Sequence, residues 1–275
     1  MDRRSIHPVL QGGPLLIAHR GGGALRPENT LAAFQHAADC WQADMIELDV
    51  RASADGHCVV IHDASVDRTT NGSGLVAHMT LPELQQLDAG HRFTPDGGVT
   101  YPWRRRGVRI STIDEVFAAL PHMRFTVEVK SADAQAPLFR AIAAHQLSER
   151  VIAAGERNAF RTMFGAYRGA KSASLEEGMP FIILHRCRLA RFGRVPADVI
   201  QTCEIYRGRR IVSPRLVNDL HRAGVLVHVW TVNETADMER LLDWGVDGLV
   251  TDRPDRLAEL LHRRLGRPLP PGAQS

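Results

Sequence analysis

The feature that most constrains the fold is a regular alternation of short apolar segments with longer segments of helical periodicity. The apolar segments have the length of strands and lie at 15–19, 45–50, 58–62, 125–129, 151–155, 171–175, 198–202, 225–231 and 248–251. The predicted helices lie at 30–40, 81–88, 113–120, 135–146, 158–168, 214–223, 235–243 and 254–265. Strands that alternate with helices of this length indicate a mainly parallel sheet. About eight such units fit a closed (β/α)8 barrel, a TIM barrel, better than an open sheet.

One connection in this pattern is too short to be a parallel crossover, which needs a dozen or more residues. Between Asp49 and His62 the chain reads VRASADGHCVVI, and Asp-Gly is a strong signal for a two-residue hairpin turn. A turn at Asp55 and Gly56 places Asp49 opposite His62. The sequence therefore predicts eight parallel strands and one antiparallel hairpin arm.

The length of 275 residues suits a single barrel domain, predicted over 1–265. After the third strand, a polar segment at about 64–110 interrupts the pattern, and we expect it to form a small inserted subdomain over one mouth of the barrel. The last ten residues, 266–275, read GRPLPPGAQS and are predicted to be a disordered tail.

Composition argues against several classes of protein. The net charge of +3 is too small to indicate nucleic-acid binding, and no apolar run is long enough to span a membrane. The N-terminal segment lacks the apolar core of a signal peptide, so we expect a cytoplasmic protein without stable membrane anchoring. The four cysteines form no CxxC pair, which favours reduced, mostly buried thiols. The oligomeric state is left open.

Acidic residues interrupt two of the predicted strands. Glu47 and Asp49 flank Leu48 in IELDV and share one face of the strand, because strand side chains alternate with period two. Glu128 stands in FTVEV. Carboxylates inside a barrel are costly without a cation, and hard oxygen ligands suit Mg²⁺ or Ca²⁺. The alternative is that the apolar face points inward and the acids point outward.

Two histidines stand at predicted strand ends, where side chains of a barrel face its active site. His19 and Arg20 come between the first strand and a glycine-rich loop, and His62 ends VVIH. Two histidines near one cation form a candidate acid–base pair. Each of them, taken alone, is also compatible with a structural role.

Lys130 and Trp230 complete the set of candidates. Lys130 is one of only two lysines in an arginine-rich chain, and its ammonium is suited to a phosphate oxygen, although an ion pair between strands is the alternative. Trp230 ends a strand and is suited to walling a pocket, although a core or rim position fits it at least as well.

Together these segments resemble the glycerophosphodiester phosphodiesterase family. The resemblance rests on AHRGGGALRPENTLAAF, MIELDVRASADGHCVVIHDASVDRTTNGSG, FTVEVK and HVWTVNETADMERLLDWGVDGLVTDRPD, which span residues of about 15–255. The order of the His-Arg-Gly, Pro-Glu-Asn-Thr, Glu-x-Asp and His-Asp blocks is highly specific. The segment 150–205 matches less well, since GERN at 155–158 stands where many relatives have a Ser-Phe pair.

The resemblance implies a TIM barrel that hydrolyses glycerophosphodiesters to sn-glycerol 3-phosphate and an alcohol. It implies His19 and His62 as the catalytic pair. It also implies one divalent ion, Mg²⁺ or Ca²⁺, and contacts to the substrate's phosphate and glycerol. The implied metal ligands are Glu47, Asp49 and Glu128, and the implied substrate-binding residues are Arg20, Lys130 and Trp230. Glu28 and Asn29 match the family as well, and we interpret them as shaping the loop and starting the helix at 30–40.

Two other functions remain open at this stage. A related barrel phosphodiesterase acts on lysophospholipids, but its mouth needs exposed apolar residues, and the inserted HRFTPDGGVTYPWRRRG is polar and basic. An inactive barrel that only binds phosphodiesters is the second alternative. The expected partner is a small-molecule glycerophosphodiester in each of the enzymatic cases.

Overall fold

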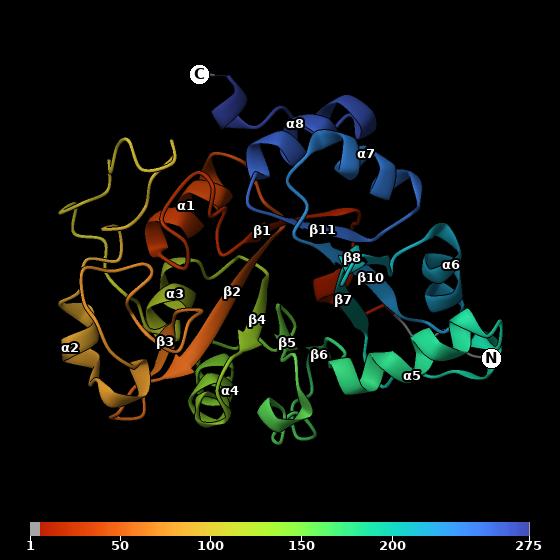
Figure 1. Cartoon of the computed structure of the whole chain (residues 1–275), viewed down its shortest axis with the longest axis horizontal. Coiled ribbons are helices and arrows are strands. Elements are labelled where there is room, and N and C mark those ends of the chain that lie inside the picture. The colour runs from red at the N-terminus through yellow and green to blue at the C-terminus, as the bar shows by residue number, and fades with distance from the viewer. Residues whose placement is uncertain (1–5, 275) are drawn as a thin grey trace.

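Eight parallel strands form the barrel that the sequence predicts (Figure 1). The structure is a computed structural model and describes residues 6–274. In spatial order, the strands are β6 (Ala170–Lys171), β5 (Val151–Ala154), β4 (Phe125–Val129), β2 (Met45–Ala52), β1 (Leu15–His19), β11 (Gly248–Thr251), β10 (Leu226–Trp230) and β7 (Val199–Cys203). A parallel bridge between Ser172 and Val199 joins the two ends of this order and nearly closes the barrel.

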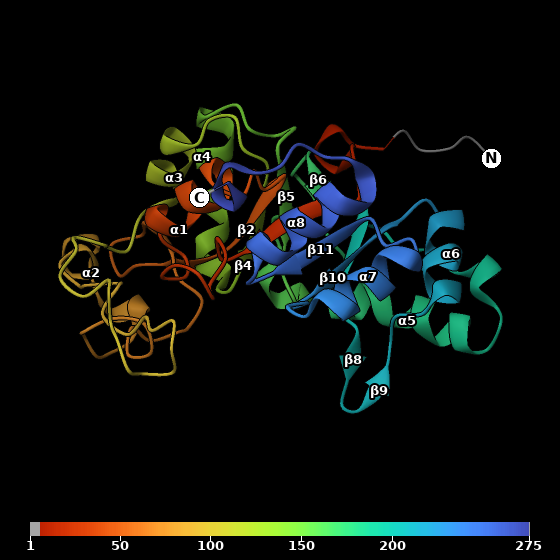
Figure 2. The same ribbon diagram turned by 90° about the horizontal axis from the view of Figure 1, so that it is seen from above.

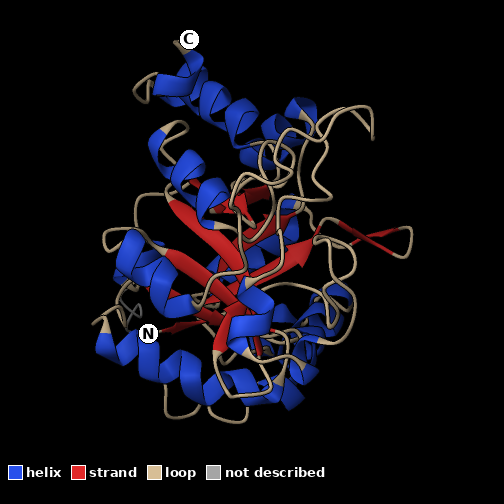
Figure 3. Cartoon of the chain, turned by 90° about the vertical axis from the view of Figure 1, so that its left-hand side faces the viewer, coloured by secondary structure: helices blue, strands red, loops and turns tan. Residues whose placement is uncertain are grey.

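Helices surround the strands, as the view coloured by secondary structure shows (Figure 3). They are α1 (Leu31–Asp39), α2 (Leu81–Gln85), α3 (Ile113–Ala119), α4 (Gln135–Ala144), α5 (Leu175–Arg186), α6 (Pro214–Arg222), α7 (Thr235–Asp243) and α8 (Pro254–Leu265). Six short 3₁₀ helices lie at Pro8–Leu10, Val76–His78, Ala132–Ala134, Asn158–Phe160, Ala190–Phe192 and Pro271–Ala273. None of the helices in residues 6–274 combines the length and apolar character needed to cross a membrane.

Strand alternation decides which side chains face the barrel interior. Leu15 and Ile17 of β1 pack with Met45 of β2 in the cluster that fills the barrel. Their neighbours Leu16 and Ala18 pack in a different cluster, against the surrounding helices. Because side chains repeat with period two, the even-numbered residues of β2 face the helices, and Met45, Glu47 and Asp49 face inward. The arrangement with outward-facing acids is therefore wrong.

The hairpin arm β3 (Cys58–Val60) pairs antiparallel with β2, but in a register one residue from the predicted one. Val50 pairs with Val60 and Ala52 with Cys58, so Asp49 is not directly opposite His62. The turn is longer than the predicted two residues: the amide of Gly56 donates to Ser53 O, and Gly56 has a φ of 82°. A three-residue loop with a left-handed glycine explains this shift.

The segment between β5 and β7 differs most from the prediction. The predicted helix at 158–168 contains only a 3₁₀ turn at Asn158–Phe160, and the predicted strand at 171–175 ends at Lys171. Helix α5 follows it and was not predicted. A second unpredicted element is a hairpin of β8 (Ile205–Tyr206) and β9 (Arg209–Arg210), which projects from the barrel (Figure 2).

The inserted segment after β3 shares a small apolar cluster with β3, formed by Val59, Ile61, Val66, Val76, Leu84, Ala89 and Ile110. It contains α2 and lies beside α1 and α3 (Figure 1). In the C-terminal segment, the amide of Gly272 donates to Cys40 O, and Gly272 lies close to Trp41. The cysteines are free, as expected, but only Cys58 of the four is buried.

Candidate functional site

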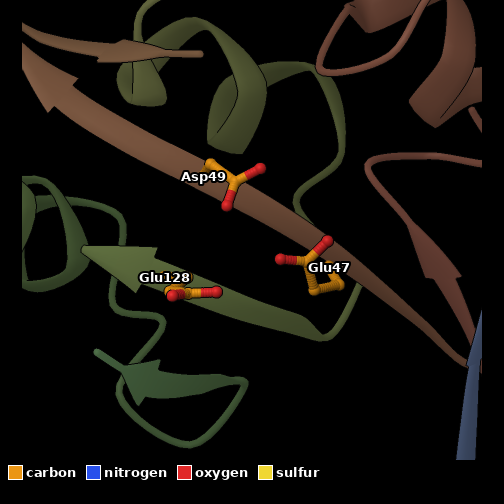
Figure 4. A group of neighbouring side chains, drawn as sticks. All are labelled: Glu47, Asp49 and Glu128. Atoms are coloured by element: carbon orange, nitrogen blue, oxygen red, sulfur yellow. The ribbon is translucent and has the colours of Figure 1, made fainter. Parts of the chain in front are cut away.

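Three carboxylates converge at the carboxyl ends of two neighbouring strands (Figure 4). Glu47 and Asp49 lie on β2, and Glu128 lies on β4, where it is the register partner of Asp49. Each residue offers a carboxylate oxygen, and these oxygens lie within 4.8 Å of one another. Glu47 and Asp49 are buried, with exposed fractions of 7% and 1%. The structure thus brings together the three acids that the sequence singled out.

The charges of this cluster fit a hard divalent cation. Burial and the neighbouring charge of Asp49 raise the pKa of Glu47, and burial likewise raises the pKa of Glu128. Burial also opposes ionisation of Asp49, but Lys130 and Arg20 outweigh it and lower the pKa of this carboxyl. Three close oxygen donors with unfavourable mutual repulsion are the ligand type that Mg²⁺ and Ca²⁺ prefer.

His19 ends β1 and is held by a residue from the other end of the chain. Its Nδ1 lies 2.6 Å from Asp252 Oδ1, and its Nε2 lies 3.9 Å from Glu47 Oε2. Asn233 donates a hydrogen bond to the second oxygen of Asp252. Burial lowers the pKa of His19, but the hydrogen bond to Asp252 and the charge of Glu47 outweigh it and raise the pKa. Because a carboxylate only accepts, Asp252 fixes the proton on Nδ1 and directs the other nitrogen toward the acids.

His62 is held in a similar way, by an aspartate at its Nδ1. Its Nδ1 lies 2.6 Å from Asp63 Oδ1, and its backbone carbonyl accepts from Arg51 Nε. A positive charge on His62 contributes to the lowered pKa of Asp49 and partly opposes the rise in the pKa of Glu128. His62 therefore lies near the acids, as predicted, although not by the predicted strand pairing.

Two cations accompany the acids. Arg20 Nε lies 3.2 Å from Asp49 Oδ2, and its backbone amide donates to Glu47 Oε2. Lys130 Nζ lies 2.8 Å from Glu128 Oε1 and 3.3 Å from Asp49 Oδ1. Lys130 therefore forms the ion pair between neighbouring strands that was the alternative interpretation. This ion pair lies within the candidate site. A phosphate group bound here would meet both positive charges.

A pocket of about 230 Å³ opens beside His19. Its lining residues are His19, Arg20, Gly23, Ala24, Glu28 and Asp252. The preceding glycines are required by the backbone: Gly21 and Gly22 have φ of 84° and 90°, and a Cβ on Gly22 would lie 2.9 Å from Pro254 Cγ. The glycine-rich loop therefore packs closely against the start of α8 and leaves room for a ligand next to His19.

Trp230 lies at the carboxyl end of β10, where it is the register partner of Cys203. Its side chain is 45% exposed, so the alternative of a core tryptophan is wrong. Within residues 6–274 we find no hydrogen bond or ring contact between Trp230 and the acidic cluster. Trp230 shares the mouth of the barrel with the site and is available to a ligand that extends across it.

The Pro-Glu-Asn-Thr block has a different role from the expected one. Thr30, not Asn29, caps α1 through its side chain. Asn29 is buried, donates to Asp49 Oδ2 from its amide and accepts the backbone N–H of Asp49. Glu28 accepts from Arg20 Nη1 and from the guanidinium of Arg68. These two residues therefore orient a candidate ligand and a candidate phosphate-binding residue.

Sequence reasoning missed Asp252, Asn233, Asp63 and Arg68 as members of the site. A signal existed for the first of these, because Asp252 directly follows the last strand, just as His19 ends the first. The His-Asp block gave a signal for Asp63. Nothing in the local pattern distinguished Arg68.

A parallel barrel with acids, histidines and cations at the carboxyl ends of its strands defines a TIM-barrel enzyme, since active sites of this fold form at that face. A sequence model of the glycerophosphoryl diester phosphodiesterase family matches residues 19–256. The glycerophosphodiester phosphodiesterase of Caldanaerobacter subterraneus subsp. tengcongensis is 37% identical over 259 residues, 90% of this chain and 98% of that protein. That of Bacillus subtilis is 32% identical, covering 88% of this chain and 84% of its own length. The chain belongs to the glycerophosphoryl diester phosphodiesterase family and is a glycerophosphodiester phosphodiesterase.

Solved structures show the same fold. The glycerophosphoryl diester phosphodiesterase domain of an uncharacterised Mycobacterium tuberculosis protein superimposes with a TM-score of 0.81 at 20% identity, over 91% of this chain and all of that one. An Oleispira antarctica phosphodiesterase in complex with the product sn-glycerol-3-phosphate gives a TM-score of 0.71 at 23% identity, over 90% of this chain and 96% of that one. At these identities the likeness concerns the fold alone.

Proposed function

We propose that this enzyme hydrolyses glycerophosphodiesters to sn-glycerol 3-phosphate and an alcohol, with one divalent ion, Mg²⁺ or Ca²⁺, held by Glu47, Asp49 and Glu128. The observation that carries the proposal is the convergence of these three carboxylates, together with two histidines that are each held by an aspartate. The sn-glycerol-3-phosphate complex of the Oleispira antarctica phosphodiesterase supports the product class.

Arg20 and Lys130 bind the phosphate of the substrate in this proposal. Both cations lie within 3.3 Å of Asp49, so they are fixed beside the cation site before substrate arrives. Fixed positive charge stabilises the charge that builds up on phosphoryl oxygens in the transition state. When bound, the divalent ion adds positive charge at a non-bridging oxygen and lowers the repulsion that opposes attack. Trp230 walls the glycerol end of the substrate.

His19 and His62 transfer the protons. Each imidazole has its Nδ1 on an aspartate, at 2.6 Å in both cases, which leaves Nε2 for the substrate. One histidine takes a proton from the nucleophile, and the other gives a proton to the leaving alcohol. His19 lies beside Glu47, with its Nε2 3.9 Å from Glu47 Oε2, whereas His62 acts electrostatically on Asp49 and Glu128.

The nucleophile we propose is the substrate's own hydroxyl next to the phosphoester carbon. Effective molarities of well-oriented internal groups reach about 10⁵–10⁸ M, which favours a tethered nucleophile over free water. This hydroxyl loses its proton to one histidine and forms a P–O bond, the alcohol leaves with a proton from the other, and a cyclic phosphate results. Water then opens the ring as the histidines exchange roles. Direct attack by water is the alternative.

Lysophospholipid hydrolysis remains the second candidate, and the exposed Trp230 at the mouth is the observation that favours it. A panel of soluble diesters and lysophospholipids compares the two. An inactive barrel is disfavoured because every proposed catalytic side chain is in place. A cytoplasmic location stays part of the proposal and rests on the free cysteines.

The test is removal and return of the cation. After exhaustive chelation, we expect activity against glycerophosphodiesters to disappear and to return with Mg²⁺ or Ca²⁺. Calorimetry provides a second readout: Glu128→Gln weakens cation binding, whereas Glu239→Gln, an exposed carboxylate on α7, leaves it unchanged. Full activity of a chelated preparation with no detectable metal contradicts the proposal.

A further inference from the structure

Arg68 lies near the start of the inserted segment and connects two parts of the site that the barrel itself does not join. Its Nη1 and Nη2 donate to the two oxygens of Glu28 at 2.6 and 2.8 Å. Its Nε donates to Asp63 Oδ2 at 2.5 Å. A single planar guanidinium thus holds two carboxylates, one from the loop after β1 and one from the loop after β3.

Each of these carboxylates holds a residue that contacts the substrate in the proposed function. Glu28 Oε1 accepts from Arg20 Nη1 at 2.8 Å. Asp63 Oδ1 accepts from His62 Nδ1 at 2.6 Å. Burial opposes the ionisation of both acids, but the hydrogen bonds from Arg68 outweigh it, lowering the pKa of Glu28 and bringing that of Asp63 to about 2. Both carboxylates therefore stay charged and oriented.

We infer that Arg68 is a positioning residue for glycerophosphodiester hydrolysis, fixing His62 through Asp63 and Arg20 through Glu28. The inference rests on the proposed function, since it uses the roles given there to His62 and Arg20. It also gives the inserted segment a part in the reaction, because this segment supplies the residue that connects His62 and Arg20.

The geometry requires an arginine at this position. The guanidinium presents donors along two edges, so that Glu28 receives two parallel hydrogen bonds while Nε still reaches Asp63. A lysine ammonium at the same place reaches one carboxylate well, but not both in this arrangement. Alanine leaves the two carboxylates without their common partner, free to turn away from Arg20 and His62.

The experiment compares Arg68→Ala and Arg68→Lys with Arg109→Ala in steady-state hydrolysis of glycerophosphodiesters. Arg109 is a matched control, because it lies in the same inserted segment, is similarly exposed and forms one ion pair with Glu115 at 2.7 Å. We expect Arg68→Ala to lower kcat/KM by about 10–100-fold, with changes in both kcat and KM. Loss of a residue that orients catalytic groups reduces activity by this order. Arg68→Lys is expected to retain more of the wild-type kcat/KM than Arg68→Ala does. Arg109→Ala is expected to have the kcat/KM of the wild type.

A double-mutant cycle separates positioning from general destabilisation. If Arg68 acts through Asp63, adding Arg68→Ala to Asp63→Asn lowers kcat far less than it does in the wild type. Melting temperatures of all variants are measured alongside, and the Lys variant carries the test if the Ala variant unfolds. If the losses in kcat of the two single variants multiply in the double variant, this inference alone is overturned. The same holds if the wild type is active and Arg68→Ala has the same kcat. A wild type that hydrolyses no glycerophosphodiester overturns the proposed function and this inference with it.

Discussion

Acidification is expected to destabilise the barrel through His228, a residue of β10 with no exposed surface. The ring occupies space that a glycine leaves free: a Cβ on Gly248 would lie 2.8 Å from His228 Cδ2. Gln201 Nε2 lies 3.4 Å from Nδ1, whereas Nε2 of the ring has no hydrogen-bond partner among the described residues. Burial, opposed by the charge of Asp247 and assisted by that of Arg124, lowers the pKa of His228 to about 4.

The sign of the effect follows from proton linkage. The unfolded chain, with a histidine pKa of 6.5, binds the proton more tightly than the folded protein does, so stability falls as the pH decreases from 6.5 toward 4. With these two pKa values, the contribution of His228 to the free energy of unfolding decreases by roughly 2–3 kcal/mol between about pH 7 and about pH 4.5. This is a large part of the stability of an ordinary domain.

Urea unfolding of the wild type and of His228→Gln, with chelator present throughout, measures this contribution. The substitution removes the titrating group, so the loss of stability on acidification should be smaller in the variant by roughly 2–3 kcal/mol. His221→Gln is the control of opposite sign. The hydrogen bond to Asp247 raises the pKa of His221, so its stabilisation is complete below 6.5 and is lost as the pH rises through the folded pKa. Equal acid-induced losses in the wild type and His228→Gln would refute the reasoning.

Three further predictions concern the reaction. His19→Ala and His62→Ala should each lower kcat by about 10²–10⁴-fold, as for the loss of a general acid or base, and near-normal turnover of both in steady-state assays contradicts the assignment. Asp252→Asn should lower kcat at least about tenfold with little change in melting temperature, because an amide no longer fixes the imidazole of His19 as the carboxylate does. A substrate analogue with hydrogen in place of the hydroxyl next to the phosphoester carbon should bind almost normally but turn over orders of magnitude more slowly. Hydrolysis at a rate close to that of the parent substrate excludes the internal nucleophile.

The barrel and its three acids could be predicted because both depend on local periodicity. Period-two alternation places Glu47 and Asp49 on the face opposite to Leu48. Which of the two faces lies inside the barrel is decided by packing, because Met45 belongs to the cluster that fills the barrel. The region around α5 could not be predicted in this way. Its sequence carries Gly178 and Pro180 within the helix, residues that disfavour helices, and α5 shows no clear apolar stripe. The predicted register of the hairpin was wrong for a different reason, because Asp-Gly fits both two-residue and three-residue loops.

The residues around the histidines show which contacts can be predicted from sequence patterns and which cannot. Asp252 is 233 positions from His19, yet it follows from the fold: β1 and β11 are parallel neighbours, and Ala18 pairs with Thr251, so the next residues of the two strands must lie side by side. A predicted barrel with a predicted register therefore contains this contact, and the residue after each strand is the place to search for partners of a catalytic side chain. Arg68 is different, because it belongs to a loop without periodicity, 40 positions from Glu28, and no sheet register places it. A repeating pattern therefore encodes contacts between strand ends, such as His19 with Asp252, whereas a contact made by the inserted segment, such as Arg68 with Glu28, is known only from the structure.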